Sequence, residues 1–197
     1  MTATLHPFTL LFASIFTSNI LLANFLGMCS FIAISREPKS AFGLGFAVTV
    51  VMTVCGAFSY FALRYIIMPL GLEYLSFILF IILIAAVVQV LEMILERVAP
   101  ALYMTLGIFL PLVTVNCAIL GVVLFMQIRQ YTFLQTLAFC AGSGLGWWLA
   151  IVLLAAIRQR IENNPMPAGL KGKGITIITI GFMAMAFMGF SGMIPVQ

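Results

Sequence analysis

Two cysteines of this 197-residue chain, Cys29 and Cys117, stand at matching positions of two long apolar stretches. Residues 26–32 read LGMCSFI and residues 114–120 read TVNCAIL, so the similarity extends to both sides of each cysteine. A thiolate in hydrocarbon is too costly to exist without a compensating cation, because burial disfavours the charged form. If the fold brings the two sulfur atoms together, the pair predicts a metal site.

The other two cysteines, Cys55 and Cys140, lie in plain apolar stretches and have no counterpart in the other half of the chain. A single cysteine in such a stretch is usually a small apolar side chain that fills space. We therefore expect Cys55 and Cys140 to be packing residues.

The type of metal site follows from the ligands available. An iron–sulfur cluster takes four thiolates, whereas this chain offers two in suitable places and has no C-x-x-C spacing. Such a cluster would have to be completed by another protein of the same complex. A disulfide between Cys29 and Cys117 is the competing explanation. Zinc is disfavoured, because the only histidine, His6, lies near the N-terminus and far from both cysteines in the sequence.

Glu92 is the one carboxylate clearly inside a predicted membrane span. A charge at the membrane centre costs at least about 2.5 to 3.5 kcal/mol, so an intramembrane acid is a candidate for cation or proton passage. The alternative is that Glu92, one turn from Glu96 and Arg97, reaches the cytoplasmic interface.

The composition places the chain in a lipid bilayer. Hydrophobic residues make up 64% of the sequence and charged residues 7%, and charge-free runs longer than one membrane crossing recur. No glycine-rich phosphate loop, dinucleotide fingerprint or serine–histidine–acid set is present, so we expect no catalytic residue and no NADH chemistry on this chain. No basic patch is interleaved with aromatics, so we expect no nucleic-acid partner.

The apolar runs predict an all-α integral membrane protein with a single polytopic domain over residues 1–197. We expect six transmembrane helices near residues 8–34, 41–63, 74–95, 101–127, 131–157 and 174–193. Basic residues concentrate in the loops after the first, third and fifth spans, which predicts cytoplasmic loops there and both termini in the periplasm. These residues are Arg36, Lys39, Arg97, Arg158, Arg160, Lys171 and Lys173, against Arg64 and Arg129 on the other side.

The two halves, approximately residues 8–97 and 101–193, predict a 3+3 inverted repeat, because three spans in each half force opposite orientations in the membrane. A second sequence similarity between the halves links residues 42–46 (FGLGF) with residues 143–147 (SGLGW), where the glycines favour close helix packing. The first and fourth helices are predicted to be interrupted near mid-membrane, a pattern typical of binding sites. The alternative is that the glycines in these helices only allow close helix packing and that the proline only kinks its helix. The residues behind this prediction are Asn19, Asn24, Gly27, Gly107, Pro111, Asn116 and Gly121.

Several motifs together resemble the family of E subunits of bacterial sodium-translocating NADH:quinone oxidoreductases. They are residues 25–29 (FLGMC), 91–95 (LEMIL), 106–112 (LGIFLPL), 115–119 (VNCAI), 144–147 (GLGW), 169–176 (GLKGKGIT) and 186–192 (AFMGFSG). The resemblance runs from about Asn19 to Gly192. The motif at 106–112 is shared with the A subunit of the Rnf ferredoxin:NAD oxidoreductase.

The resemblance implies that Cys29 and Cys117 are iron ligands of a 2Fe-2S cluster shared with a homologous membrane protein of opposite topology, the D subunit of such complexes. It also implies that electrons pass from a cytoplasmic flavin through this cluster to a flavin on the far side and on to ubiquinone, coupled to sodium export. NADH, the flavins and the quinone would be bound by other subunits of a six-subunit complex in the inner membrane. The resemblance further implies that Glu92 is the acidic residue that this family links to sodium movement.

Besides the possibility that the chain is only an assembly scaffold, two other interpretations remain open at the level of sequence. One is the A subunit of the Rnf complex, which predicts the same cluster. The other is a stand-alone permease for small solutes with inverted repeats, which would need a water-filled cavity with a polar lining.

Overall fold

The structure is a computed structural model that describes residues 6–35, 37–71, 73–98, 113–162 and 172–190. In this part of the chain the regular structure is helical, with no β-strand. The elements in order are α1 (Pro7–Ile15), α2 (Met28–Ile34), α3 (Pro38–Ala62), the π-helical turn η1 (Leu63–Ile67), α4 (Met68–Leu70), the 3-10 turn η2 (Glu73–Leu75), α5 (Ser76–Val98), α8 (Cys117–Arg129), α9 (Phe133–Glu162) and α10 (Lys173–Met188).

Three of the described helices are long and apolar enough to cross a membrane, at Pro38–Ile67, Ser76–Ile94 and Phe133–Ile161. At about 1.5 Å per residue, they reach or exceed a hydrocarbon core of about 30 Å. α8 and α10 are apolar but shorter. The prediction of an all-α protein with apolar spans is confirmed in the described residues. Gly107 and Pro111, on which the predicted interruption of the fourth helix partly depends, lie outside them.

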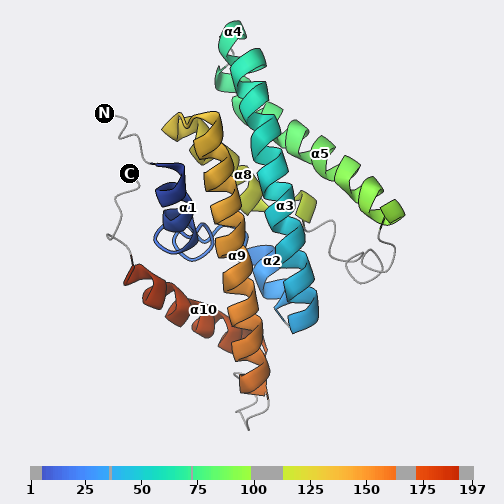
Figure 1. Ribbon diagram of the computed structural model, residues 1–197. Coiled ribbons are helices and arrows are strands. Elements are labelled where there is room, and N and C mark those ends of the chain that lie inside the picture. The colour runs from blue at the N-terminus through green and yellow to red at the C-terminus, as the bar shows by residue number, and fades with distance from the viewer. Residues whose placement is uncertain (1–5, 36, 72, 99–112, 163–171, 191–197) are drawn as a thin grey trace.

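The centre of the fold is the antiparallel pair formed by α3 and α9, which lie side by side along most of their length (Figure 1). Glycines permit this approach, because a side chain at Gly45 would strike Trp148, and one at Gly144 would lie 2.8 Å from the Cα of Thr49. The prediction that the Gly-x-Gly elements serve close packing is therefore confirmed at Gly45 and Gly144. Gly43 differs, because nothing lies within 4 Å of a side chain added there.

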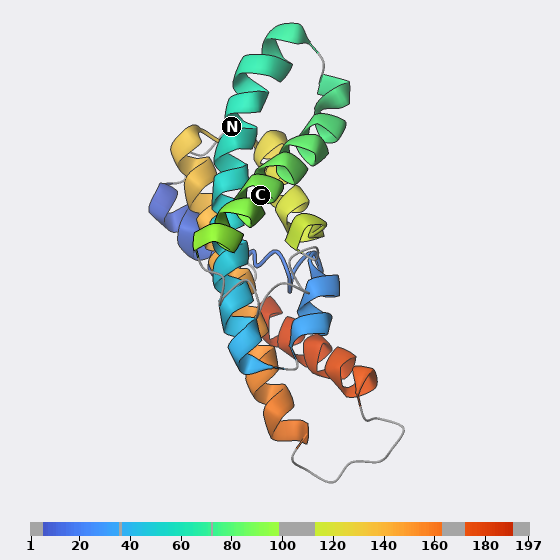
Figure 2. The same cartoon turned by 90° about the vertical axis from the view of Figure 1, so that its right-hand side faces the viewer.

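α5 and α10 lie at an angle to this central pair. α5 begins at the end where α3 stops, and α10 begins near the end where α9 stops; from there each runs back toward the level of the middle of the pair (Figures 1 and 2). Large apolar side chains of both helices are exposed, including Ile82 and Phe182. α1 packs against α9 on the opposite side from α5.

Two basic residues, Arg158 and Arg160, lie on α9 where the sequence indicates a loop after the fifth span. The sequence places Arg158 in a loop after the fifth span, but α9 continues to Glu162 and Arg158 is a buried residue of that helix. The physical reason is that its guanidinium hydrogen-bonds to the end of α2, so the helix extends past the apolar run without exposing the charge.

Candidate site at the two helix breaks

Both cysteines of the sequence prediction lie at the beginning of a helix. Cys29 is the second residue of α2, and Cys117 is the first residue of α8. The two helices start near the middle of the molecule and run in opposite directions, α2 toward the beginning of α3 and α8 toward the beginning of α9 (Figure 2). Each cysteine therefore stands where a short helix starts in the interior of the fold.

The first break lies between Ile15 and Met28, inside the range predicted for the first span. Here the chain turns through two left-handed residues, Phe25 with φ 55° and Gly27 with φ 85°. The buried Asn19 satisfies backbone groups that the break leaves open. Its side-chain oxygen accepts from the N–H groups of Leu21 at 3.1 Å and Leu22 at 3.4 Å.

The same side chain also joins this break to α9. The Asn19 amide nitrogen donates to the carbonyl oxygen of Ile15 at 3.1 Å and to that of Gly146 at 2.9 Å. Unsatisfied backbone groups in hydrocarbon cost several kcal/mol each, on the order of the penalty for a lost hydrogen bond in vacuum. Asn19 is therefore a structural residue of the break, and it explains one of the polar positions that the sequence singles out.

The second break lies just before Cys117. Asn116 is the N-cap of α8, and its side-chain oxygen accepts from the backbone N–H of Ala118 at 3.0 Å. An asparagine is among the preferred N-cap residues, because it satisfies one of the open N–H groups of the first turn. Asn116 itself is buried.

The two breaks are in direct contact. The backbone N–H of Gly27 donates to the Sγ atom of Cys117, with N and Sγ 2.8 Å apart. A Cβ atom at Gly27 would lie 3.1 Å from both the Cβ of Ala118 and the Oδ1 of Asn116, so only glycine fits this approach. The structure thus brings the segment that carries Cys29 against the segment that carries Cys117.

A second contact of the same kind lies one turn further along α8. Leu26 packs against Gly121, where an added side chain would strike the Leu26 methyl group. Gly121 therefore allows close packing, which is the alternative interpretation that the sequence allows for these glycines.

The four cysteines divide into two kinds. All are free thiols in the structure, and Cys29 and Cys117 are exposed whereas Cys55 and Cys140 are buried. Gly56, next to Cys55 on α3, lies directly against the Cys140 side chain of α9. The prediction that Cys55 and Cys140 are packing residues agrees with this burial, and the structure has no disulfide between Cys29 and Cys117.

The described residues contain no group of three or more histidine, cysteine or acidic side chains that could hold a metal ion. The chemical groups at the break are thus two thiols, backbone N–H groups, the side-chain amide of Asn116 and the indole N–H of Trp147, among apolar neighbours. Thiolates at this place would receive favourable electrostatic support from the Gly27 N–H and from the positive end of α8.

Sequence reasoning missed the residues that hold the far end of α2. Arg158 of α9 donates to the Ser35 hydroxyl at 2.8 Å, and its Nη1 atom lies 3.5 Å from the carbonyl oxygen of Ile32. A cation at a helix C-terminus is stabilising, because the open carbonyls there carry partial negative charge. No local motif could have revealed this contact, since Arg158 and Ser35 are 123 positions apart.

Glu92 lies within α5, half-buried, and the helix continues beyond it to Val98. No hydrogen bond or ion pair between Glu92 and another described residue is present. Nothing in the described part of the chain joins it to the cysteine segments, so its predicted role in sodium movement stays a prediction.

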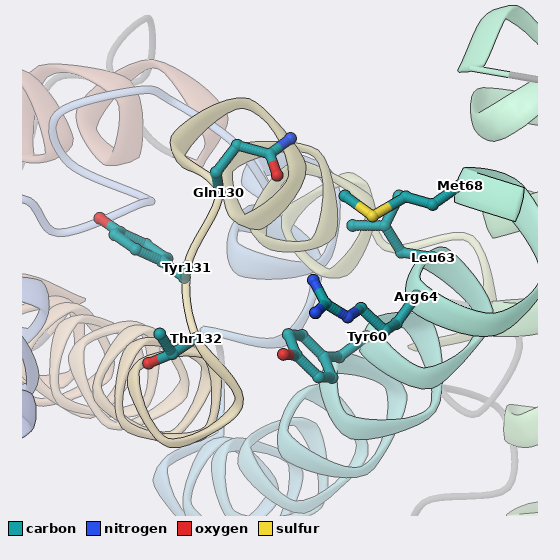
Figure 3. Close-up of a pocket in the computed structure, with 7 residues that line it drawn as sticks. All are labelled: Tyr60, Leu63, Arg64, Met68, Gln130, Tyr131 and Thr132. Atoms are coloured by element: carbon teal, nitrogen blue, oxygen red, sulfur yellow. The ribbon is translucent and has the colours of Figure 1, made fainter. Parts of the chain in front are cut away.

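A separate pocket of about 210 Å³ lies at the end of α3, beside the connection between α8 and α9. Its lining contains no thiol, carboxylate or imidazole, so it offers no ligands for the predicted cluster. Figure 3 shows the Arg64 guanidinium extending toward this connection beside the Tyr60 ring. The lining residues are Tyr60, Leu63, Arg64, Met68, Gln130, Tyr131 and Thr132.

Comparison with known proteins identifies relatives over nearly the whole chain. Residues 7–194 match the family described as "Rnf-Nqr subunit, membrane protein". The E subunit of the Na(+)-translocating NADH-quinone reductase of Proteus mirabilis is 49% identical over 193 residues, which cover 95% of this chain and 98% of the relative. The proteins of the same name from Aeromonas hydrophila and Aeromonas salmonicida are each 51% identical with the same coverage.

These relatives are components of a membrane oxidoreductase complex, and their identity with this chain is far above the level at which a family is shared. The apolar helical fold carries two exposed thiols at facing helix breaks. The chain that forms it belongs to the Rnf-Nqr family and is similar over 95% of its length to the E subunits of Na+-translocating NADH-quinone reductases.

Proposed function

We propose that this chain is the E subunit of a Na+-translocating NADH-quinone reductase, in which Cys29 and Cys117 provide two of the four ligands of a 2Fe-2S cluster. A homologous protein of opposite topology, the D subunit of the complex, would provide the other two. The observation that carries the proposal is the contact between the two breaks, where the Gly27 N–H donates to Cys117 Sγ. The similarity to E subunits supports this membership over the Rnf A subunit and over a stand-alone permease.

The residues at the break fit such a group. Both thiols are exposed on this chain, so a partner protein can approach them, whereas the two buried cysteines are closed off. Gly27 has no side chain to fill the space beside Cys117, and its N–H already points at the sulfur. Hydrogen bonds from backbone N–H groups to thiolate sulfur are a common feature of iron–sulfur sites and stabilise their negative charge.

When bound, the cluster would supply a one-electron relay between a cytoplasmic flavin and a flavin on the far side, on the path to ubiquinone. The chain's own contribution is to position two sulfur atoms where a partner protein can approach them. Apolar side chains around the breaks, among them Leu22, Phe31 and Ile119, are buried and keep the site in a low-dielectric environment.

The arrangement of the helices supports the finer topology as part of the proposal. α2 leads into α3, α8 leads into α9, and the two units run in opposite directions, as two halves of a 3+3 inverted repeat would. The proposal includes six spans in the inner membrane, and the excess of basic residues in alternate loops supports an orientation with both termini in the periplasm. Glu92, inside the span Ser76–Ile94, is the candidate for the sodium pathway.

The experiment uses the whole complex, purified with each cysteine of this chain changed in turn to alanine. We expect Cys29→Ala and Cys117→Ala to abolish the electron paramagnetic resonance signal of the intramembrane cluster and to lower bound iron and acid-labile sulfide by one cluster per complex. Cys55→Ala and Cys140→Ala are the matched controls, because they make the same chemical change at buried packing positions.

Intact iron content and an unchanged spectrum in the Cys29→Ala complex would overturn the proposal. So would equal loss of iron in all four variants, since that result would reflect general instability rather than ligation.

A further inference from the structure

Two buried hydrogen-bond donors beside the breaks have no acceptor among the described residues. They are the indole nitrogen Nε1 of Trp147 and the side-chain nitrogen Nδ2 of Asn116. Trp147 has an exposed fraction of 0% and Asn116 of 3%, so water does not reach them. A buried donor without an acceptor is unfavourable by about 1–3 kcal/mol and is rare in native proteins, so each such donor calls for a physical explanation.

Both donors belong to side chains that flank Gly27. A Cβ atom built on Gly27 would lie 2.8 Å from Trp147 Nε1 and 3.1 Å from Asn116 Oδ1, and the Gly27 N–H donates to Cys117 Sγ. Asn116 directly precedes Cys117 in the chain. The Trp147 N–H, the Asn116 side-chain amide and the Cys117 sulfur therefore lie around one glycine that has no side chain to come between them.

We propose that the side chains of Trp147 and Asn116, together with the Gly27 N–H, are the hydrogen-bond donors that stabilise negative charge on the sulfur atoms held at Cys117. This inference rests on the proposed function, because the acceptor it requires is the sulfur of a thiolate or of a bound cluster. It assigns to Trp147 and Asn116 a positioning and potential-setting role that the ligand prediction does not contain.

The physical basis is the change in charge when one electron arrives. Reduction would add one negative charge to the cluster as a whole, which its sulfur atoms share, and an N–H donor to sulfur in a low-dielectric site would stabilise the reduced form more than the oxidised form. Loss of a donor should therefore lower the reduction potential, even when the ligands and the packing remain.

The chain contains its own control for this idea. Trp148, the neighbour of Trp147 and the only other tryptophan, also has a buried indole N–H without an acceptor among the described residues. Its ring, however, lies against Gly45 and makes edge contacts with Phe42 and Phe46 on α3. These neighbours are a glycine and two phenylalanines and include no sulfur, so loss of the Trp148 N–H should leave the potential unchanged.

The test is a redox titration of the purified complex, followed by electron paramagnetic resonance of the intramembrane cluster. Trp147→Phe keeps an aromatic ring and removes the N–H, and Asn116→Ser keeps an N-capping oxygen and removes the amide N–H. For each we expect the ratio of reduced to oxidised cluster at a fixed ambient potential to fall about tenfold, which corresponds to about 59 mV for one electron. Trp148→Phe should give the wild-type titration.

A second readout does not depend on the potential. After exchange into D2O, the deuterium couplings of N–H groups close to the cluster are visible in pulsed spectra. Trp147→Phe should remove one such coupling, whereas Trp148→Phe should remove none.

The outcomes separate this inference from the proposed function. An intact cluster with unchanged potential and unchanged couplings in both Trp147→Phe and Asn116→Ser would overturn the inference and leave the ligand proposal standing. A wild-type complex with no cluster dependent on Cys29 and Cys117 would overturn both. If Trp147→Phe fails to assemble, the titration of Asn116→Ser and its lost coupling decide the question.

Discussion

Replacing Gly27 by alanine tests the contact between the two breaks most directly. Gly27 has φ 85°, a conformation that costs an alanine about 1–2 kcal/mol. The added methyl group would also lie 2.8 Å from Trp147 Nε1 and 3.1 Å from Asn116 Oδ1 and Ala118 Cβ. Overpacking of this kind costs about 1–3 kcal/mol, so the total loss of stability is about 2–5 kcal/mol.

Three other glycines separate these two contributions. Gly71 has φ 65° and open space around it, so Gly71→Ala carries only the backbone cost of about 1–2 kcal/mol. Gly45 is helical but an added side chain strikes Trp148, so Gly45→Ala carries only the crowding cost, reduced by the better helix propensity of alanine of about 1 kcal/mol. Gly43 is helical and open, so Gly43→Ala should be neutral or slightly stabilising.

The assay is the apparent melting temperature of the detergent-solubilised complex carrying each variant, followed by the fraction that remains assembled after heating. We expect Gly27→Ala to be less stable than Gly71→Ala, Gly45→Ala to be destabilised by crowding alone, and Gly43→Ala to match the wild type or to be slightly more stable. If Gly27→Ala is no worse than Gly71→Ala, the methyl group meets no obstacle, and the close approach of the two cysteine segments is refuted.

Three further substitutions probe the contacts that support the breaks. Asn19→Ala leaves the backbone N–H groups that it caps without an acceptor at about 1–3 kcal/mol each, and should lower the yield and melting temperature of the complex. Ser35→Ala removes an acceptor of the buried Arg158 and should cost about 1.5–3 kcal/mol by the same assay, whereas Ser35→Thr should retain most of the stability. Gly56→Ala should destabilise by about 1–3 kcal/mol and should be rescued by Cys140→Ala, so a double-mutant cycle with no coupling would contradict the contact between them.

The sequence is sufficient to predict the features that depend on local chemistry. Runs without charge predict membrane helices, and matched motifs around Cys29 and Cys117 predict that these two cysteines differ from Cys55 and Cys140. Gly27 and Asn116 indicate interrupted helices because glycine and asparagine are residues that end and begin them.

The contacts between distant segments could not be obtained in this way. Arg158 follows an apolar run, and a basic residue at that position is typical of a cytoplasmic loop, so only the packing of α9 against α2 reveals that it is buried. Trp147 is part of a family motif, yet its place beside Gly27 depends on how α9 meets the first break. Such pairings are set by tertiary packing, which neither periodicity nor local spacing encodes.

Both ends of the seven-residue helix α2 are hydrogen-bonded to the other half of the chain. The Gly27 N–H before its first turn donates to Cys117 of α8, and Ser35 after its last turn accepts from Arg158 of α9. The α3–α9 pair already joins the two halves along most of its length, and α2 adds two further contacts between them close to the thiols. Any movement of one half against the other near the thiols would therefore have to break at least one of these two hydrogen-bonded contacts.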